Sequence, residues 1–480
     1  MRNLTLLTDL YELTMMQGYF KTGNNRTVIF DAFHRKNPCD GGYSISCGLD
    51  QVIDYINNLH FTEDDITYLR SLNIFDEDFL EYLANFKFTG DIYAIPEGSV
   101  MFPKEPIVKV IAPIMEAQLV ETAILNIINH QSLIATKAAR VCYAAQGDGI
   151  MEFGLRRAQG PDAGIYGARA AVIAGCIGTS NVLAGQMFNI PVKGTHAHSW
   201  IMSFPDEYTA FKTYADLYPN ACILLVDTYD TLRSGVPNAI KVFTEMRNAG
   251  IELKGYGIRL DSGDLAYLTK KARKMLDNAG FEDAIISASS DLDEYLIDSL
   301  KTQGAQITSW GVGTNLITSK DNPAFGGVYK LAAVMGDDGK FIPKIKVSEN
   351  SEKITNPGNK TVYRVYDTNG MIKADLITLA DEKYDETEPL LLFDPIETWK
   401  KTLLEPGEYT MREIMVQVFK NGECVYTTPE VMDIQAYCKK ELATVWDETK
   451  RLINPQEVHV DLSKPLYDIK HELLNNYGRD

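Results

Sequence analysis

The stretch YGIRLDSGD, residues 256–264, decides the fold class of this chain. A short, mainly apolar run ends in Asp, Ser and Gly, which is typical of a buried strand followed by a turn. The same pattern recurs from about residue 148 onward, and stretches of helical spacing separate the runs. The expected strands are 150–153, 192–195, 223–227, 256–261, 285–289, 307–312 and 328–334. Strands that alternate with helices pair in parallel.

The number of strand–helix units favours a barrel. About seven or eight units fit an irregular α/β barrel, and an open doubly wound sheet is the competing architecture. In a barrel the carboxyl ends of all strands meet on one face, where active sites form. The polar residues that follow the apolar runs are therefore candidate site residues.

The flanking sequence predicts two further regions. Residues 1–130 mix helices and strands, and we expect an N-terminal α/β sandwich domain that chain after the barrel completes. Residues 131–345 would form the barrel. Residues 346–480 predict a C-terminal α+β region that packs on the N-terminal domain, with antiparallel strands first and helices last.

Composition excludes several classes of function. The net charge of −18 argues against a nucleic-acid partner, which would need a basic face. Seven scattered cysteines without a CxxC motif indicate free thiols in a reducing compartment. The N-terminus lacks the apolar run of a signal peptide, and no stretch approaches the ~18 apolar residues of a membrane span. We expect a cytoplasmic protein.

The densest polar cluster is GTHAHSW, residues 194–200. In a strand, His196 and His198 would share one face, as in some metal-dependent barrel hydrolases. No histidine lies between 199 and 458, however, so later strands offer no further imidazole ligand. A role as nucleophile or proton shuttle remains open. A purely structural histidine is the alternative, more for His196 than for His198.

Two earlier strand ends carry candidate ligands. Phe153 could stack on a flat ring and Arg156 could grip a phosphate or carboxylate, unless Phe153 is core and Arg156 makes a surface ion pair. Asp227, which ends the run ILLV, could orient an imidazole or could cap the next helix.

The run 256–264 contains three charged side chains, Arg259, Asp261 and Asp264. Arg259 could bind a carboxylate in a bidentate fork, and Asp261 could accept ribose hydroxyls or hold Mg²⁺. The alternative is a local salt bridge, with Asp264 capping the next helix.

Two glycine-rich loops complete the set, at residues 311–314 and 325–328. Glycine lets backbone amides approach a phosphate, and barrels often bind phosphate after strands seven and eight. Ordinary turn glycines are the alternative. No Walker-type loop is present.

Taken together, these motifs resemble those of the nicotinate phosphoribosyltransferases, in the same order, from about residue 5 to about 335. The motifs are TDLYELT (8–14), EFGLRR (152–157), GTSN (178–181), GTHAH (194–198), VDTYD (226–230), RLDSGD (259–264) and GVGT (311–314). The resemblance implies ATP-coupled transfer of phosphoribosyl from phosphoribosyl pyrophosphate to nicotinate, an early reaction of NAD synthesis. It also implies Mg²⁺ and a homodimer with active sites shared between subunits.

The resemblance also implies residue roles. His198 corresponds to the histidine that ATP phosphorylates, with Asp227 as its orienting acid. Tyr11 from the neighbouring subunit and Phe153 correspond to the pair that encloses the pyridine ring. The other implied contacts are Arg259 and Thr195 to nicotinate, Arg156 near substrate and phosphate, Asp261 to ribose, and Gly313, Thr314, Gly326 and Gly327 to the 5′-phosphate.

Ser180 bears on the choice of substrate. Nicotinamide-using relatives carry an Asp at this position, and a carboxylate there would repel nicotinate. The alternatives to nicotinate transfer are a related enzyme acting on nicotinamide or quinolinate, a metal-dependent barrel hydrolase, and an inactive scaffold homologue.

Overall fold

The computed structural model describes residues 3–477, which divide into two compact units. One unit spans Ile134–Pro323, and the other combines the chain before Ile134 with the chain from Ala324 onward. Helix α6, Glu121–Ala144, runs through the boundary. Among the described residues no helix is long and apolar enough to cross a membrane.

The unit Ile134–Pro323 is built on a parallel six-stranded sheet of order β7-β6-β11-β10-β9-β8. Its strands are β6 (Gly149–Glu152), β7 (Gly178–Thr179), β8 (Ile223–Leu225), β9 (Gly257–Leu260), β10 (Ile285–Ala288) and β11 (Ser309–Val312). The first strand, β6, pairs with the last, β11, and this first-to-last pairing is that of a barrel. The predicted α/β class with a parallel sheet is confirmed.

The barrel is open on one side. Val192 forms only an isolated bridge to Thr179, so the predicted strand 192–195 is wrong. The apolar spacing there is strand-like, but within residues 3–477 β8 pairs with β9 alone, so the segment 192–195 adds no strand beside β8.

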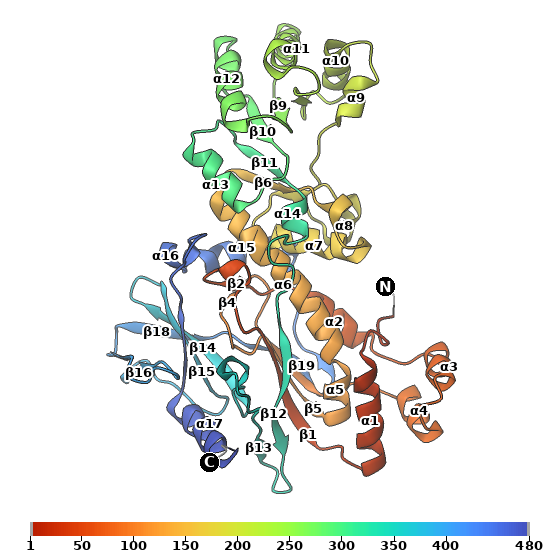
Figure 1. Cartoon of the computed structure of the whole chain (residues 1–480), viewed down its shortest axis with the longest axis vertical. Coiled ribbons are helices and arrows are strands. Elements are labelled where there is room, and N and C mark those ends of the chain that lie inside the picture. Colours follow the sequence, from red (N-terminus) through yellow and green to blue (C-terminus); the bar gives the residue numbers. More distant parts are fainter. Residues whose placement is uncertain (1–2, 478–480) are drawn as a thin grey trace. The chain divides into compact units, whose positions relative to one another are not determined.

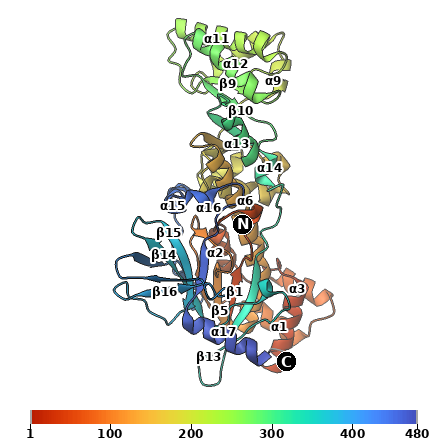
Figure 2. The same ribbon diagram turned by 60° about the vertical axis from the view of Figure 1, so that its left-hand side comes forward.

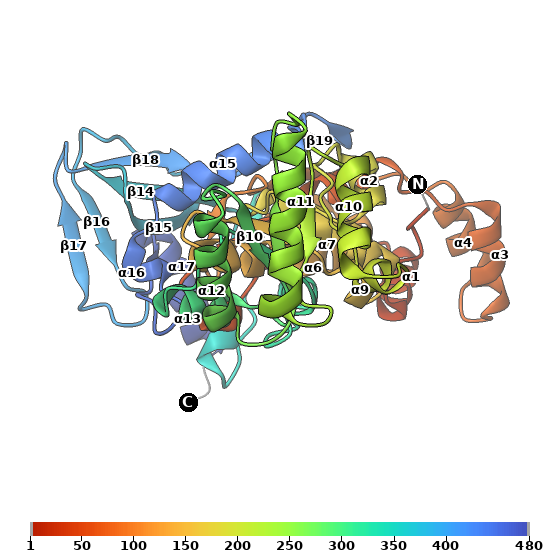
Figure 3. The same ribbon diagram turned by 90° about the horizontal axis from the view of Figure 1, so that it is seen from above.

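Helices connect the strands. They are α7 (Pro161–Ile173), α8 (Val182–Phe188), α9 (His198–Met202), α10 (Glu207–Leu217), α11 (Val236–Asn248), α12 (Leu265–Asn278), α13 (Glu294–Thr302) and α14 (Thr314–Ile317). Side chains cap the N-termini of α8, α10, α12 and α13. Asp264 caps α12 by accepting from the amide of Tyr267 at 2.8 Å, which confirms the capping alternative for this residue. Figure 3 shows α10, α11 and α12 lying side by side.

The other unit contains a seven-stranded sheet of order β13-β12-β1-β5-β3-β19-β20. Its strands are β1 (Thr27–Phe33), β3 (Asp91–Ala94), β5 (Val108–Pro113), β12 (Val328–Met335), β13 (Phe341–Pro343), β19 (Val416–Lys420) and β20 (Glu423–Cys424). Figure 1 shows β1, β5 and β12 running together. The helices before the barrel are α1 (Leu10–Thr22), α2 (Leu49–Asn57), α3 (Glu63–Ser71), α4 (Glu77–Ala84) and α5 (Ile114–Leu119).

The position of strand β12 differs from the sequence-based prediction. The run 328–334 was expected to close the barrel, but it pairs antiparallel with β1. The rings of Phe30 and Tyr329 stack at 4.7 Å between centroids, and Tyr329 is buried. This long-range aromatic pair stabilises β12 in the other sheet.

The C-terminal region adds a four-stranded sheet of order β18-β14-β15-β21 beside the hairpin β16–β17 (Figure 2). Its elements are β14 (Lys360–Asp367), β15 (Ile372–Leu379), β16 (Leu390–Phe393), β17 (Lys401–Leu404), β18 (Tyr409–Glu413), β21 (His459–Leu462), α15 (Val431–Ala443), α16 (Asp447–Lys450) and α17 (Lys464–Tyr477). The antiparallel strands and late helices predicted here are confirmed.

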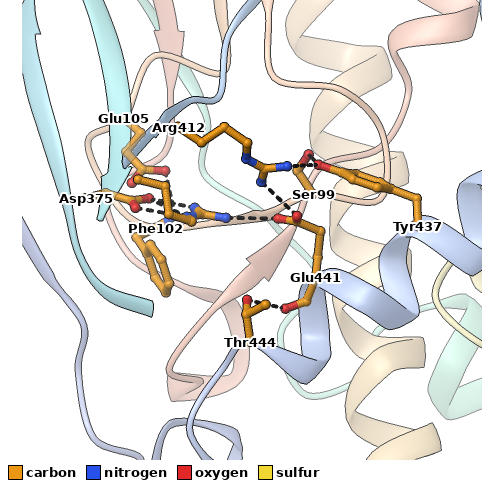
Figure 4. Close-up of polar contacts among 9 residues, drawn as sticks. Ser99, Phe102, Glu105, Asp375, Arg412, Tyr437, Glu441 and Thr444 are labelled. Carbon is orange, nitrogen blue, oxygen red and sulfur yellow. Dashed lines mark hydrogen bonds and ion pairs between the residues drawn. The ribbon is translucent and has the colours of Figure 1, made fainter. Parts of the chain in front are cut away.

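A buried charge network ties this sheet to α15 and to an N-terminal loop (Figure 4). Arg364 donates to Asp375 at 2.6 Å and to Glu441 at 3.1 Å, and Arg412 reaches Glu441 at 2.7 Å. Burial raises the pKa of Glu105 well above its usual range, and the neighbouring Asp375 adds to the shift. The raised pKa favours the neutral form of Glu105, whose Oε2 accepts from the amide of Phe102 at 2.9 Å.

Candidate active site

A cavity of about 680 Å³ lies at the carboxyl ends of the barrel strands. Most residues predicted for the site line it: Phe153, Arg156, Ser180, Thr195, His198, Arg259, Asp261, Gly313 and Thr314. The unit Ile134–Pro323 supplies all of them. The convergence of strand ends on one face explains why residues far apart in sequence meet here.

His198 is the first residue of α9, with Ala197 at the N-cap. The expectation that His196 and His198 project from one strand is therefore wrong. The Nδ1 of His198 lies 3.0 Å from Oγ1 of Thr228. Its Nε2 lies 3.9 Å from Asp227 and 3.8 Å from Asp261, so both carboxylates face the ring without a hydrogen bond.

Asp227 joins the ends of β8 and β9. Its Oδ2 accepts from the amide of Asp261 at 2.8 Å and from the hydroxyl of Ser262 at 2.7 Å. Its Oδ1 is buried and has no hydrogen-bond partner within residues 3–477. The carboxylate therefore keeps one oxygen for a ligand while the other fixes the loop after β9.

Arg259 lies on β9 and donates through Nη1 to Oγ1 of Thr195. Its Nε is buried and unpaired in the described part of the chain. Burial lowers the pKa of Arg259, although Asp261 and Asp227 oppose that effect. A guanidinium with unused donors beside a hydroxyl is suited to a carboxylate ligand.

His196 is buried behind His198, with an exposed fraction of 8%. Its Nε2 accepts from the amide of Leu225 at 3.3 Å, and the ring of Tyr214 meets it edge-on at 4.6 Å. Burial lowers the pKa of His196 to about 4. His196 is therefore neutral at physiological pH and belongs to the structural alternative.

The aromatic wall of the cavity depends on a glycine. A Cβ at Gly311 would lie 2.6 Å from the Phe153 ring, so only glycine leaves room for that ring. Gly313 precedes α14, and a Cβ there would meet the Phe153 carbonyl at 3.2 Å. Ser180 lines the cavity, and its amide donates to the Glu152 carbonyl at 3.0 Å.

Three predicted residues belong to the other unit. Tyr11 lies on α1 and is 45% exposed. Gly326 and Gly327 precede β12, and the amide of Gly327 donates to Oδ1 of Asn129 at 3.1 Å. The amide of Gly327 is thus already engaged within its own unit.

The cavity is also lined by Arg157, which the sequence pairs with Arg156 at the same strand end, and by three residues that the sequence analysis did not predict: Ser289, Ser290 and Asp291. The hydroxyl of Ser289 donates to Asp261. These three residues from 289 to 291 follow β10, so the rule applied to the other strand ends would have found them. Arg156, Arg157 and Arg259 place positive charge in the cavity of an acidic chain, which favours an anionic ligand.

The geometry does not fit the hypothesis that His196 and His198 bind zinc together. Nε2 of His196 is occupied by a backbone N–H. No group of three or more His, Cys, Asp or Glu residues suited to a metal occurs in the part of the chain that the structure describes.

Comparison with known proteins covers nearly the whole chain. Three family models match in succession: the nicotinate phosphoribosyltransferase N-terminal domain (6–129), the family itself (149–367) and its C-terminal domain (359–470). A Bacillus subtilis nicotinate phosphoribosyltransferase is 48% identical over 475 residues, 98% of this chain and 96% of that protein. The human protein of that name is 30% identical over 98% of this chain and 96% of its own length. The crystal structure of human nicotinic acid phosphoribosyltransferase superimposes with a TM-score of 0.82 at 28% identity, covering 98% of this chain and 99% of that one.

Proposed function

The chain belongs to the nicotinate phosphoribosyltransferase family, and from this premise we propose that it phosphoribosylates nicotinate in NAD synthesis. Phosphoribosyl pyrophosphate would supply the phosphoribosyl group, nicotinate mononucleotide and pyrophosphate would be the products, and ATP would be consumed. The observation that supports this most directly is the pairing of Arg259 with Thr195 beside Phe153, which matches a flat ring that carries a carboxylate.

The pyridine end of the cavity needs only to position its substrate. Phe153 offers a ring face, and Arg259 with Thr195 offers donors for the carboxylate. The nucleophile is the pyridine nitrogen itself, so binding in the correct orientation is the main catalytic task. Ser180 brings no negative charge that would repel nicotinate.

The ribose end carries the negative charge. Displacement of pyrophosphate builds positive character on the sugar ring, and Asp227 and Asp261, which are joined by a hydrogen bond, would stabilise it. Asp261 would also contact ribose hydroxyls. The unpaired Oδ1 of Asp227 and the part-exposed Asp261 fit Mg²⁺, whose remaining ligands would be substrate oxygens and water. Mg²⁺ bound there would neutralise charge on the pyrophosphate.

His198 is the residue we assign to phosphorylation by ATP. Its ring is 38% exposed at the cavity. Thr228 would orient the ring, and the carboxylates of Asp227 and Asp261 would stabilise positive charge on it. Asp227 would act on the imidazole by charge, since the hydrogen bond to the ring comes from Thr228.

The remaining assignments complete the proposal. Arg156 would contact substrate and phosphate, and Gly313 and Thr314 would bind the 5′-phosphate. The role of Gly326 and Gly327 in binding the 5′-phosphate stays a prediction from the family resemblance. Tyr11 of a neighbouring subunit would cover the pyridine ring in a homodimer. The cysteines form no disulfide within residues 3–477, as suits a cytoplasmic enzyme. We propose three regions, 1–130, 131–345 and 346–480, of which the second carries the active site; its last part, from Ala324, contributes β12 and β13 to the sheet of the first.

A pyrophosphate-release assay tests the function. Purified protein is supplied with phosphoribosyl pyrophosphate and with nicotinate, nicotinamide or quinolinate, each with and without ATP. We expect release with nicotinate, stimulated by ATP. Pyrophosphate release with nicotinamide or quinolinate but not with nicotinate would identify that other base as the substrate. Stoichiometric zinc in a protein without transferase activity would favour the hydrolase.

A further inference from the structure

The open side of the barrel sheet is bridged by a side chain. Strand β8 pairs with β9 along one edge. On its other edge, the amide of Leu225 donates to Nε2 of His196 at 3.3 Å. In a closed barrel, a backbone carbonyl from a neighbouring strand would accept this N–H. Here an imidazole nitrogen takes that place.

The direction of this hydrogen bond fixes the protonation state of His196. A backbone amide can only donate, so Nε2 carries a lone pair and the proton of the neutral ring is on Nδ1. Burial lowers the pKa of the ring to about 4, in agreement with a neutral imidazole. The Tyr214 ring at 4.6 Å and the Phe211 ring at 6.3 Å hold it in place.

The same hydrogen bond controls two site residues. Thr195 precedes His196 and receives a hydrogen bond from Arg259, while His198 follows two residues later and contacts Thr228. Leu225 lies two residues before Asp227 on β8. One contact therefore sets the position of the loop with Thr195 and His198 relative to the strand end with Asp227.

We propose that His196 is a positioning residue, whose unprotonated Nε2 substitutes for a strand carbonyl and holds Thr195 and His198 against β8. The kinetic part of this inference rests on the proposed function, while the tautomer rests on geometry alone. The two histidines of the motif thus have different roles: His196 positions the loop, and His198 is the residue that ATP would phosphorylate.

The decisive comparison uses two variants. His196→Phe keeps a ring against Tyr214 but leaves the Leu225 amide buried without an acceptor. We expect the KM for nicotinate to rise about ten-fold and ATP stimulation to fall by a similar factor. The KM for phosphoribosyl pyrophosphate should change less than about two-fold. His196→Gln, whose Oε1 reaches as far as Nε2, should restore most of both properties.

His34 provides the matched control. It is buried in the other unit, its Nε2 lies 3.1 Å from Asn37, and burial lowers its pKa to about 4. His34→Phe should leave the KM for nicotinate and the ATP stimulation of the folded enzyme unchanged. A His34→Phe effect equal to that of His196→Phe would reduce the kinetic change to general destabilisation and overturn the positioning role.

Nitrogen NMR of the ¹⁵N-labelled wild-type protein tests the tautomer without any activity. The His196 signals are assigned by their loss in His196→Gln, and we expect Nδ1 protonated and Nε2 unprotonated at pH 7. A protonated Nε2, or a Gln variant as impaired as the Phe variant although folded, overturns the proposal. Absence of nicotinate-dependent pyrophosphate release by the wild type would refute the proposed function and leave the tautomer result intact.

Discussion

The Nδ1 of His198 lies 3.0 Å from Oγ1 of Thr228, whereas the nearest oxygens of Asp227 and Asp261 lie 3.8–3.9 Å from the opposite ring nitrogen. The hydroxyl therefore fixes the rotation of the imidazole, and the carboxylates act on it through charge. This arrangement separates the orientation of the ring from the stabilisation of its charge.

Thr228→Val removes that hydroxyl and keeps the shape of the side chain. A neutral hydrogen bond contributes about 0.5–1.5 kcal/mol, so we expect acid-labile phosphate transfer from ATP to the protein to fall about two- to ten-fold. The KM for nicotinate should stay within about two-fold. Thr244→Val, in which the lost hydroxyl bonds only to Ile240 within α11, is the control. Unchanged phosphate labelling would remove Thr228 from the site.

Arg259→Ala tests the carboxylate contact. A charge-assisted pair is worth about 1.5–3 kcal/mol, so the KM for nicotinate should rise about ten- to a hundredfold. Arg259→Lys should recover only part, because lysine lacks the planar fork. Arg233→Ala, with a side chain 91% exposed, should leave the constant unchanged. Equal KM values for the Arg259→Ala variant and the wild type would show that another group binds the carboxylate.

Ser180→Asp tests the choice between acid and amide. A carboxylate at this wall of the cavity would repel nicotinate and could accept from the amide of nicotinamide. We expect kcat/KM for nicotinate to fall about ten-fold or more, and the ratio of nicotinamide to nicotinate turnover to rise. Ser180→Ala should keep the wild-type preference. A ratio that does not move in the Asp variant would place discrimination elsewhere.

The sequence predicts most of this site because each strand end obeys a local rule. Asp227 and Asp261 follow short apolar runs and Arg259 lies near the end of one, and parallel pairing then brings the three together. The same rule, applied to β10, would have predicted Ser289 as well. Local pattern and tertiary geometry agree at these positions.

The sequence-based predictions are wrong where pairing between segments far apart in the chain determines the structure. The run 192–195 is spaced like a strand but forms one isolated bridge, between Val192 and Thr179. The segment is linked to β8 by a side chain, because Nε2 of His196 accepts a hydrogen bond from the amide of Leu225, about thirty residues away. The run 328–334 is a strand, yet stacking of Tyr329 on Phe30 accompanies its pairing with β1. Neither partner can be read from local periodicity.

Glu12 should make stability depend on pH. It is fully buried on α1 and accepts from Thr122 at 2.6 Å, and burial raises its pKa to about 7. Between its ordinary pKa near 4.5 and about 7, the folded chain holds a proton that the unfolded chain has lost. Stability should therefore fall as pH rises through this window, by up to about 3 kcal/mol, because each unit of pKa shift corresponds to about 1.4 kcal/mol.

Glu12→Gln should remove that slope, because a neutral amide does not titrate. The measurement is the urea midpoint of the unit that contains α1, at pH 5 and pH 8, for the variant and the wild type. Glu81→Gln, exposed on α4, should keep the wild-type slope. Parallel pH profiles for the wild type and Glu12→Gln would show that Glu12 does not carry the effect.

Arg364 should be costly to remove, because it is fully buried and forms ion pairs with both Asp375 and Glu441. Arg364→Met leaves those carboxylates in the interior without their main cation, so we expect a loss of about 3–5 kcal/mol in the free energy of unfolding. Adding Asp375→Leu removes one stranded charge and should regain part of that loss. Arg70→Met breaks an exposed pair with Glu77 and should cost less than about 1 kcal/mol. A loss for Arg364→Met as small as that for Arg70→Met would mean that water reaches the network, and that the neutral state assigned to Glu105 is unnecessary.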